Sequence, residues 1–338
     1  MSCRQRFGQI TFNIFIEFQK GLYFKMSKGI MLIGEPMGLF IAQSEGRLED
    51  IPGFSCAVAG AEFNVAVGMT RLELSASYLT KLGRDPFGKQ IVKAMERNGI
   101  NTDLVSWSEE HSTGFMMKSM VSSGDPDIFY FRKNSAASTL SAEDIAQVDF
   151  SAYQWVHVTG ILPALSQSTR EATMFLLEKA RENGLTVSFD PNLRPQLWAS
   201  QQEMVRVLNE IAAKSDIVLP GDSEGLILTG SRDPEAIAEF YLKRGAKTVV
   251  VKQGPKGAYA ARAQERFFVP GFSVEKVVDT VGAGDGFAVG IISALMENLP
   301  LREAVRRGNA IGAIQVMSRG DNEGLPTREQ LQRFMQAK

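Results

Sequence analysis

The chain has few of the residues that build disulfide frameworks and metal centres. Its 338 residues include two cysteines and two histidines. Two thiols do not make a disulfide framework in a chain of this size, and neither residue type recurs at the short spacing that metal ligands show. This composition is typical of a reducing compartment, so we expect a cytoplasmic location.

Long apolar runs and an excess of one charge are also lacking. The sequence holds no run of about eighteen apolar residues, the length that a membrane-spanning helix requires. Its 37 lysines and arginines are balanced by 38 acidic residues, so the formal net charge is -1. A nucleic-acid-binding protein normally carries a basic excess. We therefore expect neither a membrane nor a nucleic acid among the partners.

The N-terminal segment differs in composition from the rest of the chain. Residues 1–25 are aromatic and basic and precede a second start-like sequence, Met-Ser-Lys, at 26–28. Asn13 and Glu17 interrupt the apolar stretch, and no small-residue cleavage site follows, which argues against a secretory signal. We predict that residues 1–25 are a dispensable extension and that residues 26–338 form the functional domain. An added edge strand or contact surface is the alternative.

Short β-branched segments alternate with helical segments from residue 30 onward. Continuous apolar strands separated by amphipathic helices predict an α/β fold, with a doubly wound, mostly parallel sheet flanked by helices. Such sheets bind ligands beyond the carboxyl ends of their strands. The strand-like segments are 30–34, 75–80, 155–159, 186–189, 217–219 and 248–251, and the helical segments include 89–97, 168–182, 202–214 and 234–243.

Two stretches, residues 36–60 and 114–133, do not follow this alternation. Both are β-prone, contain glycine or proline, and show little helical periodicity. We expect them to form a small accessory sheet. A sheet of this kind can act as a lid that closes over a site and excludes water.

The segment 279–287, Asp-Thr-Val-Gly-Ala-Gly-Asp-Gly-Phe, is a glycine-rich turn that leads into apolar residues at helical spacing. A helix start presents backbone N–H groups and the positive end of the helix dipole, so it binds anions. A carboxylate beside a bound phosphate repels it, and Asp285 is understandable there if it takes a proton from an attacking hydroxyl. We expect the N–H groups of Gly282, Ala283, Gly284 and Asp285 to stabilise the phosphoryl charge. An ordinary capping aspartate is the alternative.

Two other phosphate-binding motifs are excluded by individual residues. A dinucleotide fingerprint requires a third glycine where Phe287 stands, near a first strand. A Walker loop requires a lysine after its glycines, and none follows here. The turn therefore belongs to a different class of phosphate site.

This segment resembles the second signature of the PfkB, or ribokinase-like, carbohydrate kinases, in which the aspartate of GAGD is the catalytic base. The sequence Gly-Ala-Glu-Phe-Asn-Val-Ala at 60–66 is similar to an earlier family signature. The resemblance extends from about residue 30 to about residue 327. It implies a ribokinase-like fold with a β lid, a carbohydrate hydroxyl as acceptor, ATP as donor, and Mg²⁺ to neutralise the transferring phosphate.

Within the family, the chain looks most like the kinases that act on the sugar acid 2-keto-3-deoxygluconate. The similar segments are Gly-Glu-Pro at 34–36, Phe-Tyr-Phe-Arg at 129–132, Asp-Pro-Asn-Leu-Arg at 190–194, and 319–326. Arginine presents a planar fork that pairs with a carboxylate through two charge-assisted hydrogen bonds, which suits Arg132 and Arg194 to an acid. Either arginine could instead form a surface ion pair.

The resemblance also implies other substrate contacts. It places Gly60 and Asn64 near sugar hydroxyls, Tyr130 over the ligand, and Asp321 at the wall of the site. Tyr130 could equally pack in the core, and Asp321 could cap a local turn. One departure from the pattern is Met116, where many of these kinases have a tyrosine.

Alternatives in the same family are a fructokinase, a ribokinase or a nucleoside kinase, and a further alternative is a non-catalytic sugar sensor. Many kinases of neutral sugars carry an aspartate shortly after the first strand, and residues 37–40 contain no carboxylate. A sensor would more often lose the base, which this chain retains as Asp285. A small-molecule sugar acid is therefore the expected substrate, and a homo-oligomer is compatible with the sequence.

The nucleotide side is expected from two further segments. Lys252, Gly254 and Gly257 belong to a stretch that resembles the family's VKxGxxGA sequence beside the nucleotide, and Asn309 matches a position beside the adenine. A plain hairpin turn and a helix-surface asparagine are the alternatives. Glu224 is the candidate for the Mg²⁺ network, although Gly221 replaces the asparagine that usually accompanies it.

Overall fold

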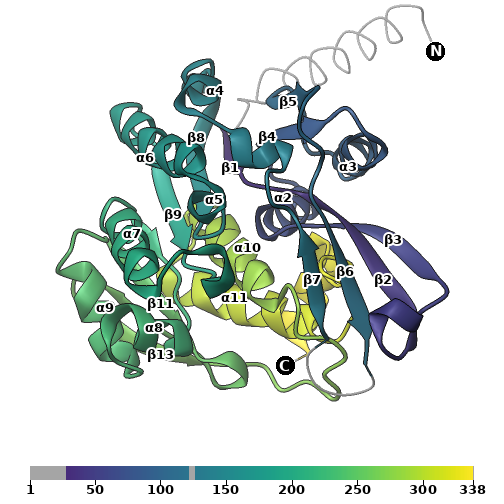
Figure 1. Ribbon diagram of the computed structural model, residues 1–338. Helices are drawn as coiled ribbons and strands as arrows, with labels where there is room; N and C mark the ends of the chain where they lie inside the picture. The colour runs from purple at the N-terminus through teal and green to yellow at the C-terminus, as the bar shows by residue number, and fades with distance from the viewer. Residues whose placement is uncertain (1–27, 122–125, 338) are drawn as a thin grey trace, which may run out of the picture.

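The computed structural model describes residues 28–121 and 126–337 (Figure 1). The expected extension, residues 1–25, lies outside the described residues. None of the helices in the described part of the chain combines the length and the apolar character that crossing a bilayer requires.

The larger of two sheets contains nine described strands in the order β13-β12-β11-β10-β9-β8-β1-β4-β5. Every neighbouring pair from β11 to β5 is parallel, whereas β12 and β13 extend the sheet as an antiparallel edge. The strands are β1 Gly29–Ile33, β4 Ala76–Gly83, β5 Val105–Ser108, β8 Tyr153–Thr159, β9 Thr186–Asp190, β10 Ile217–Val218, β11 Thr248–Lys252, β12 Gly257–Arg262 and β13 Glu265–Pro270. The segments predicted as strands all lie in this sheet, but β5, β12 and β13 were not predicted.

Helices cover both faces of the larger sheet, which explains its continuous apolar strands (Figure 1). Each face of the larger sheet has its own apolar core, and alternate residues of β1 enter one or the other. Ile30 and Leu32 belong to the core that includes residues of α2, α3, α10 and α11. Met31 and Ile33 belong to the core that includes residues of α4, α6, α7 and α9. The helices are α2 Ala61–Arg71, α3 Pro86–Arg97, α4 Ala142–Ala146, α5 Leu162–Leu165, α6 Gln167–Glu182, α7 Gln201–Ala213, α8 Asp222–Thr229, α9 Pro234–Leu242, α10 Ala283–Met296, α11 Leu301–Gln315 and α12 Arg328–Gln336. The predicted doubly wound α/β fold is confirmed.

The second sheet has four described strands in the order β3-β2-β6-β7. These are β2 Met37–Glu45, β3 Phe54–Ala59, β6 Phe115–Met120 and β7 Ile128–Phe131. The pairs β2–β3 and β6–β7 are antiparallel, and β2–β6 is parallel. Its inner face buries a small apolar cluster formed by Met37, Leu39, Ala59 and Met116. We call these four strands the lid sheet, and its residues form one wall of the cavity described next.

Candidate active site

A cavity of about 340 Å³ lies between the lid sheet and the carboxyl ends of the main strands. The lid sheet contributes Met37, Met116, Ile128 and Tyr130. The opposite wall comes from the ends of β9 and β11 and from the start of α10. Every residue predicted to contact the substrate lines this cavity: Gly60, Asn64, Tyr130, Arg132, Arg194 and Asp321.

Asp285 stands in the first turn of α10 and faces this cavity. Its Oδ2 accepts a hydrogen bond from Asn64 Nδ2 over 2.7 Å, and Asn192 Nδ2 lies 3.5 Å from Oδ1. Burial raises the pKa of Asp285 to about 6, while the hydrogen bond from Asn64 opposes this rise. A carboxyl with this pKa is mostly ionised at neutral pH and remains basic enough to accept a proton from a hydroxyl.

The turn before α10 has a backbone that only glycine tolerates at Gly282. Its φ is +78°, and a Cβ there would lie 2.1 Å from the carbonyl oxygen of Asp321. Gly286 N–H makes the first helical bond, to Gly282 O over 2.8 Å, so the N–H groups of Gly284 and Asp285 precede the helical ladder. The N–H of Ala283 is directed to Thr280 O at 3.3 Å, and Ala283 does not line the cavity of about 340 Å³.

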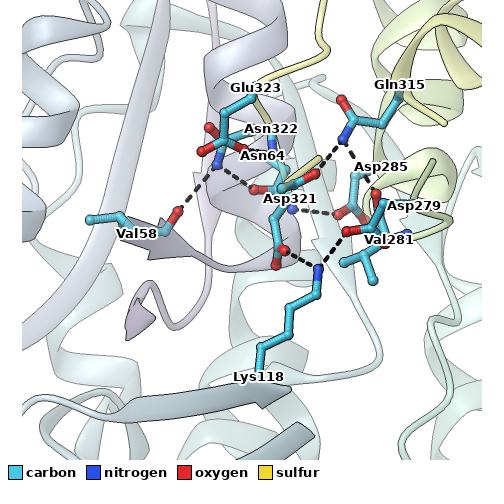
Figure 2. A network of polar contacts seen from close by, with 11 residues as sticks. Val58, Asn64, Lys118, Asp279, Val281, Asp285, Gln315, Asp321, Asn322 and Glu323 are labelled. Carbon is cyan, nitrogen blue, oxygen red and sulfur yellow. Dashed lines mark hydrogen bonds and ion pairs between the residues drawn. The ribbon is translucent and has the colours of Figure 1, made fainter. Parts of the chain in front are cut away.

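A chain of amides connects Asp285 to the lid sheet (Figure 2). Asn322 Nδ2 donates to Asn64 Oδ1 over 3.0 Å and to the carbonyl of Val58, in β3, over 3.2 Å. Asn64 in turn donates to Asp285. The orientation of the carboxylate is therefore fixed by residues from three separate parts of the chain.

The three cations at the cavity wall differ in their partners. Arg132 Nε donates to Glu35 Oε2 over 2.7 Å, and both side chains are buried. Lys252 Nζ lies 2.6 Å from Asp190 Oδ2. Arg194 donates to the carbonyl of Leu193 over 2.9 Å, and no carboxylate in the described part of the chain lies within ion-pairing distance of it. Arg194 is thus the cation of this cavity wall that forms no ion pair within the described residues, although its charge helps to lower the pKa of Asp285.

Tyr130 combines its two predicted alternatives, whereas the Asp321 side chain forms an ion pair and, among the described residues, does not cap a local turn. Tyr130 lines the cavity and also packs on the inner face of the lid sheet, with the Arg132 guanidinium 5.6 Å from its ring centre. Asp321 lines the cavity while pairing with Lys118 over 3.3 Å. Met116 is buried and lines the cavity where the family often has a tyrosine.

A second cavity, of about 470 Å³ and mostly apolar, meets the first beside the turn. Lys252, Thr280 and Gly284 line both cavities. The residues predicted to contact the nucleotide all line the second one: Lys252, Gly254, Gly257 and Asn309. The alternative of a plain hairpin turn is compatible with this placement, because 252–258 also links β11 to the antiparallel strand β12. Asn309 Nδ2 donates to the carbonyls of Val269 and Pro270, so its Oδ1 is the atom left to accept a hydrogen bond.

Glu224 lines the first cavity, but backbone N–H groups already donate to both of its carboxylate oxygens. Gly221 N–H donates over 2.6 Å and Leu193 N–H over 3.0 Å. Burial raises the pKa of Glu224, and the nearby Lys252 opposes this shift. Among residues 28–121 and 126–337, no group of three His, Cys, Asp or Glu side chains could hold a metal ion.

Several residues of the site were not predicted individually. Glu35, Asp190 and Asn192 lie in segments that carried the resemblance, but their partners are distant in sequence. Lys118 and Asn322 were not assigned any role. The available signal was a lysine within the apolar, β-prone stretch 115–120, because a charged residue in such a stretch requires a buried partner.

Known proteins resemble this chain over most of its length. Residues 27–328 match the pfkB family carbohydrate kinase profile. A 2-dehydro-3-deoxygluconokinase from Bacillus subtilis (strain 168) is 45% identical over 313 residues, which cover 92% of this chain and 97% of that protein. A PfkB protein from Polaromonas sp. JS666 has a crystal structure with a TM-score of 0.83 at 42% identity, covering 90% of this chain and 99% of the other.

A protein from E. coli assigned as Ribokinase II, in complex with ATP and Mg²⁺, matches with a TM-score of 0.83 at 28% identity, covering 92% of this chain and 100% of the other. The ribokinase-like fold and the resemblance drawn from the sequence are both confirmed. The chain belongs to the pfkB family of carbohydrate kinases and is an ATP-utilising phosphotransferase enzyme.

Proposed function

We propose that this enzyme transfers the γ-phosphate of ATP to the terminal hydroxyl of 2-keto-3-deoxygluconate, giving the 6-phosphate. The choice of an acid as the substrate rests on one observation, the lack of an ion-pair partner for Arg194 among the described residues. Arg194 lines the substrate cavity, while the other two cations there, Arg132 and Lys252, are already paired with Glu35 and Asp190. A substrate carboxylate supplies the partner that Arg194 lacks among the described residues.

Arg132 has a supporting role in this proposal. Its Nε donates to Glu35 Oε2, and its terminal nitrogen Nη2 lies 2.5 Å from the same oxygen. Other N–H groups remain to contact the acid, while Glu35 holds the side chain in place. The 45% identical relative from Bacillus subtilis carries the name of a kinase for the same acid, which supports the assignment.

Asp285 is the proposed base. It accepts the proton of the acceptor hydroxyl as the oxygen attacks phosphorus, and Asn64 keeps the carboxylate oriented. We expect the N–H groups of Gly282, Gly284 and Asp285 to stabilise the charge on the phosphoryl group. A preorganised donor of this type contributes about 3–4 kcal/mol to transition-state stabilisation.

We assign ATP to the second cavity, where apolar residues near Asn309 would hold the adenine, and Lys252 and Gly284 would face the phosphates. Mg²⁺ neutralises charge on the phosphates when it is bound. Since the described residues form no dedicated metal site, we expect phosphate oxygens and water to hold most of its coordination shell. Glu224, whose oxygens each retain a lone pair, is the proposed protein group in that network.

Steady-state kinetics on the full chain, with ATP and Mg²⁺, test the proposal. We expect kcat/KM for 2-keto-3-deoxygluconate to exceed that for fructose and for ribose by at least about tenfold, the value of one charge-assisted hydrogen bond. Mass spectrometry of the product identifies the phosphorylated sugar acid. Equal or better use of fructose would contradict the acid assignment while leaving the kinase assignment intact.

A further inference from the structure

Lys118 is a buried lysine in strand β6 of the lid sheet, and it points away from that sheet toward the turn before α10 (Figure 2). Its Nζ lies 2.7 Å from Asp279 Oδ2 and 3.3 Å from Asp321 Oδ1. The side chains of the three residues are 5%, 11% and 6% exposed, so water screens this contact little. Loss of the ammonium would leave two buried carboxylates uncompensated, which costs more than the loss of a surface salt bridge.

Both carboxylates belong to segments that shape the phosphate-binding turn. Asp279 uses its other oxygen, Oδ1, to accept the N–H of Val281 over 3.0 Å. The carbonyl of Asp321 is the atom against which Gly282 packs, since a Cβ at Gly282 would meet it at 2.1 Å. Gln315 joins the same two segments by donating to the carbonyls of Val281 and Gly320. A shift of either aspartate would therefore alter the turn.

Two kinds of polar contact connect this network to the lid sheet. One is the pairing of the Lys118 ammonium with the two carboxylates, and the other is the hydrogen bond from Asn322 to the carbonyl of Val58 (Figure 2). Burial alone would lower the pKa of Lys118, and the carboxylates of Asp321 and Asp279 outweigh that effect and raise it. The side chain is thus a charged connection between the lid sheet and the catalytic turn.

We propose that Lys118 is a positioning residue that holds the lid sheet against the phosphate-binding turn, so that closure of the lid and the geometry of the turn depend on one buried ammonium group. This inference rests on the proposed phosphoryl transfer. It requires no particular acceptor. Without the ammonium, two buried carboxylates would repel one another, and both the lid sheet and the turn would shift. Water would then reach the phosphoryl group more easily.

The test compares Lys118→Met with wild type on whichever acceptor the wild type uses best, with ATP and Mg²⁺. We expect kcat to fall at least about tenfold, while the KM for ATP changes less than about threefold. We also expect the ratio of ADP formed to acceptor phosphorylated to rise above the wild-type value, because hydrolysis competes with transfer. Lys118→Arg keeps the charge and should restore most of the coupling.

Lys81→Met is the matched control. Lys81 makes a partly buried ion pair with Asp144 over 2.9 Å, in the main sheet and away from both cavities. It should lose stability without any change in the ratio of ADP to product. If Lys118→Met does not fold, Lys118→Met/Asp279→Asn removes one of the two unpaired carboxylates and keeps an oxygen to accept Val281 N–H.

The double variant should then show the same uncoupled hydrolysis. A wild-type ratio and a wild-type kcat in a folded Lys118→Met or double variant would overturn the proposal. An arginine variant no better than the methionine variant would also contradict it. A wild type that phosphorylates only neutral sugars would refute the proposed acid substrate, and the Lys118 comparison would still be decided on those sugars.

Discussion

Asn64 Nδ2 donates a 2.7 Å hydrogen bond to Asp285 Oδ2, although the two residues are 221 positions apart in the chain. Asn64 belongs to the first turn of α2 and Asp285 to the first turn of α10. The two helices pack side by side against the same face of the main sheet. Their packing thus sets the orientation of the Asp285 carboxylate.

Replacement of the base should abolish most turnover. Asp285→Asn keeps the size of the side chain and loses the proton acceptor, so kcat should fall at least about a hundredfold. ATP binding, measured by calorimetry, should remain within about threefold of wild type. Turnover close to wild type would remove Asp285 from its proposed role.

The pH profile follows from the same carboxyl. Burial raises the pKa of Asp285 to about 6, and the proposed role as a base requires the ionised form. The value of kcat/KM should therefore rise with pH up to about 6 and level off above it. The hydrogen bond from Asn64 lowers this pKa, so Asn64→Ala should move the acid limb to higher pH and reduce activity more at pH 6 than at pH 8.

Asn98→Ala is the control for this shift. Asn98 also donates a 2.8 Å hydrogen bond, to the carbonyl of Ala94 at the end of α3, and it lines neither cavity. Its pH profile should match wild type. An unchanged acid limb in Asn64→Ala would contradict the role of the Asn64 hydrogen bond.

Alanine variants of two glycines with positive φ distinguish the cost of backbone strain from the cost of a steric clash. Gly99 has φ +70° with open space where a methyl group would lie, whereas Gly282 has φ +78° with Asp321 O at 2.1 Å from that position. Gly99→Ala should cost about 1–2 kcal/mol of stability and leave kcat unchanged. Gly282→Ala should destabilise further and reduce kcat at least about tenfold, because the turn must move.

Urea unfolding and initial rates measure both effects. Equal stability loss and equal kcat for the two variants would show that the contact with Asp321 does not constrain the turn.

The Glu35–Arg132 pair predicts a stability effect. Glu35 is 2% exposed and Arg132 is 7% exposed, and Ser135 donates a further hydrogen bond to Glu35. Glu35→Gln leaves a buried guanidinium without its counter-charge, so the free energy of unfolding should fall by about 3–5 kcal/mol. Glu35→Gln/Arg132→Met should recover part of this loss. A single variant as stable as wild type would contradict the pairing.

The fold was predictable because its signals are local. Strands buried on both faces are continuous apolar runs, and the helices between them have clear periodicity. The edge strands β12 and β13 were missed because neither is a continuous run of β-branched residues: β12 consists mostly of alanine and glycine, and β13 begins with two charged residues. The family resemblance was visible in the turn because the residues of its signature are nine consecutive ones, 279–287.

The partners within the site were not predictable in the same way. Lys118 contacts residues 161 and 203 positions away, and Arg132 contacts Glu35 from 97 positions away. A sequence shows that Arg132 and Arg194 are arginines, but it does not show which of them meets a protein carboxylate. That distinction depends on packing of the lid sheet and makes Arg194 the more important residue for an acid.

The acceptor selectivity of Arg194→Met compared with wild type tests the central claim most directly. The measurement is kcat/KM for 2-keto-3-deoxygluconate divided by kcat/KM for fructose, with Arg206→Met as the control, since Arg206 forms an exposed pair with Glu210. We predict that Arg194→Met lowers this ratio by about tenfold to a hundredfold, through the KM for the acid, and leaves the KM for ATP unchanged. A ratio in Arg194→Met equal to that of wild type and of Arg206→Met would contradict the account.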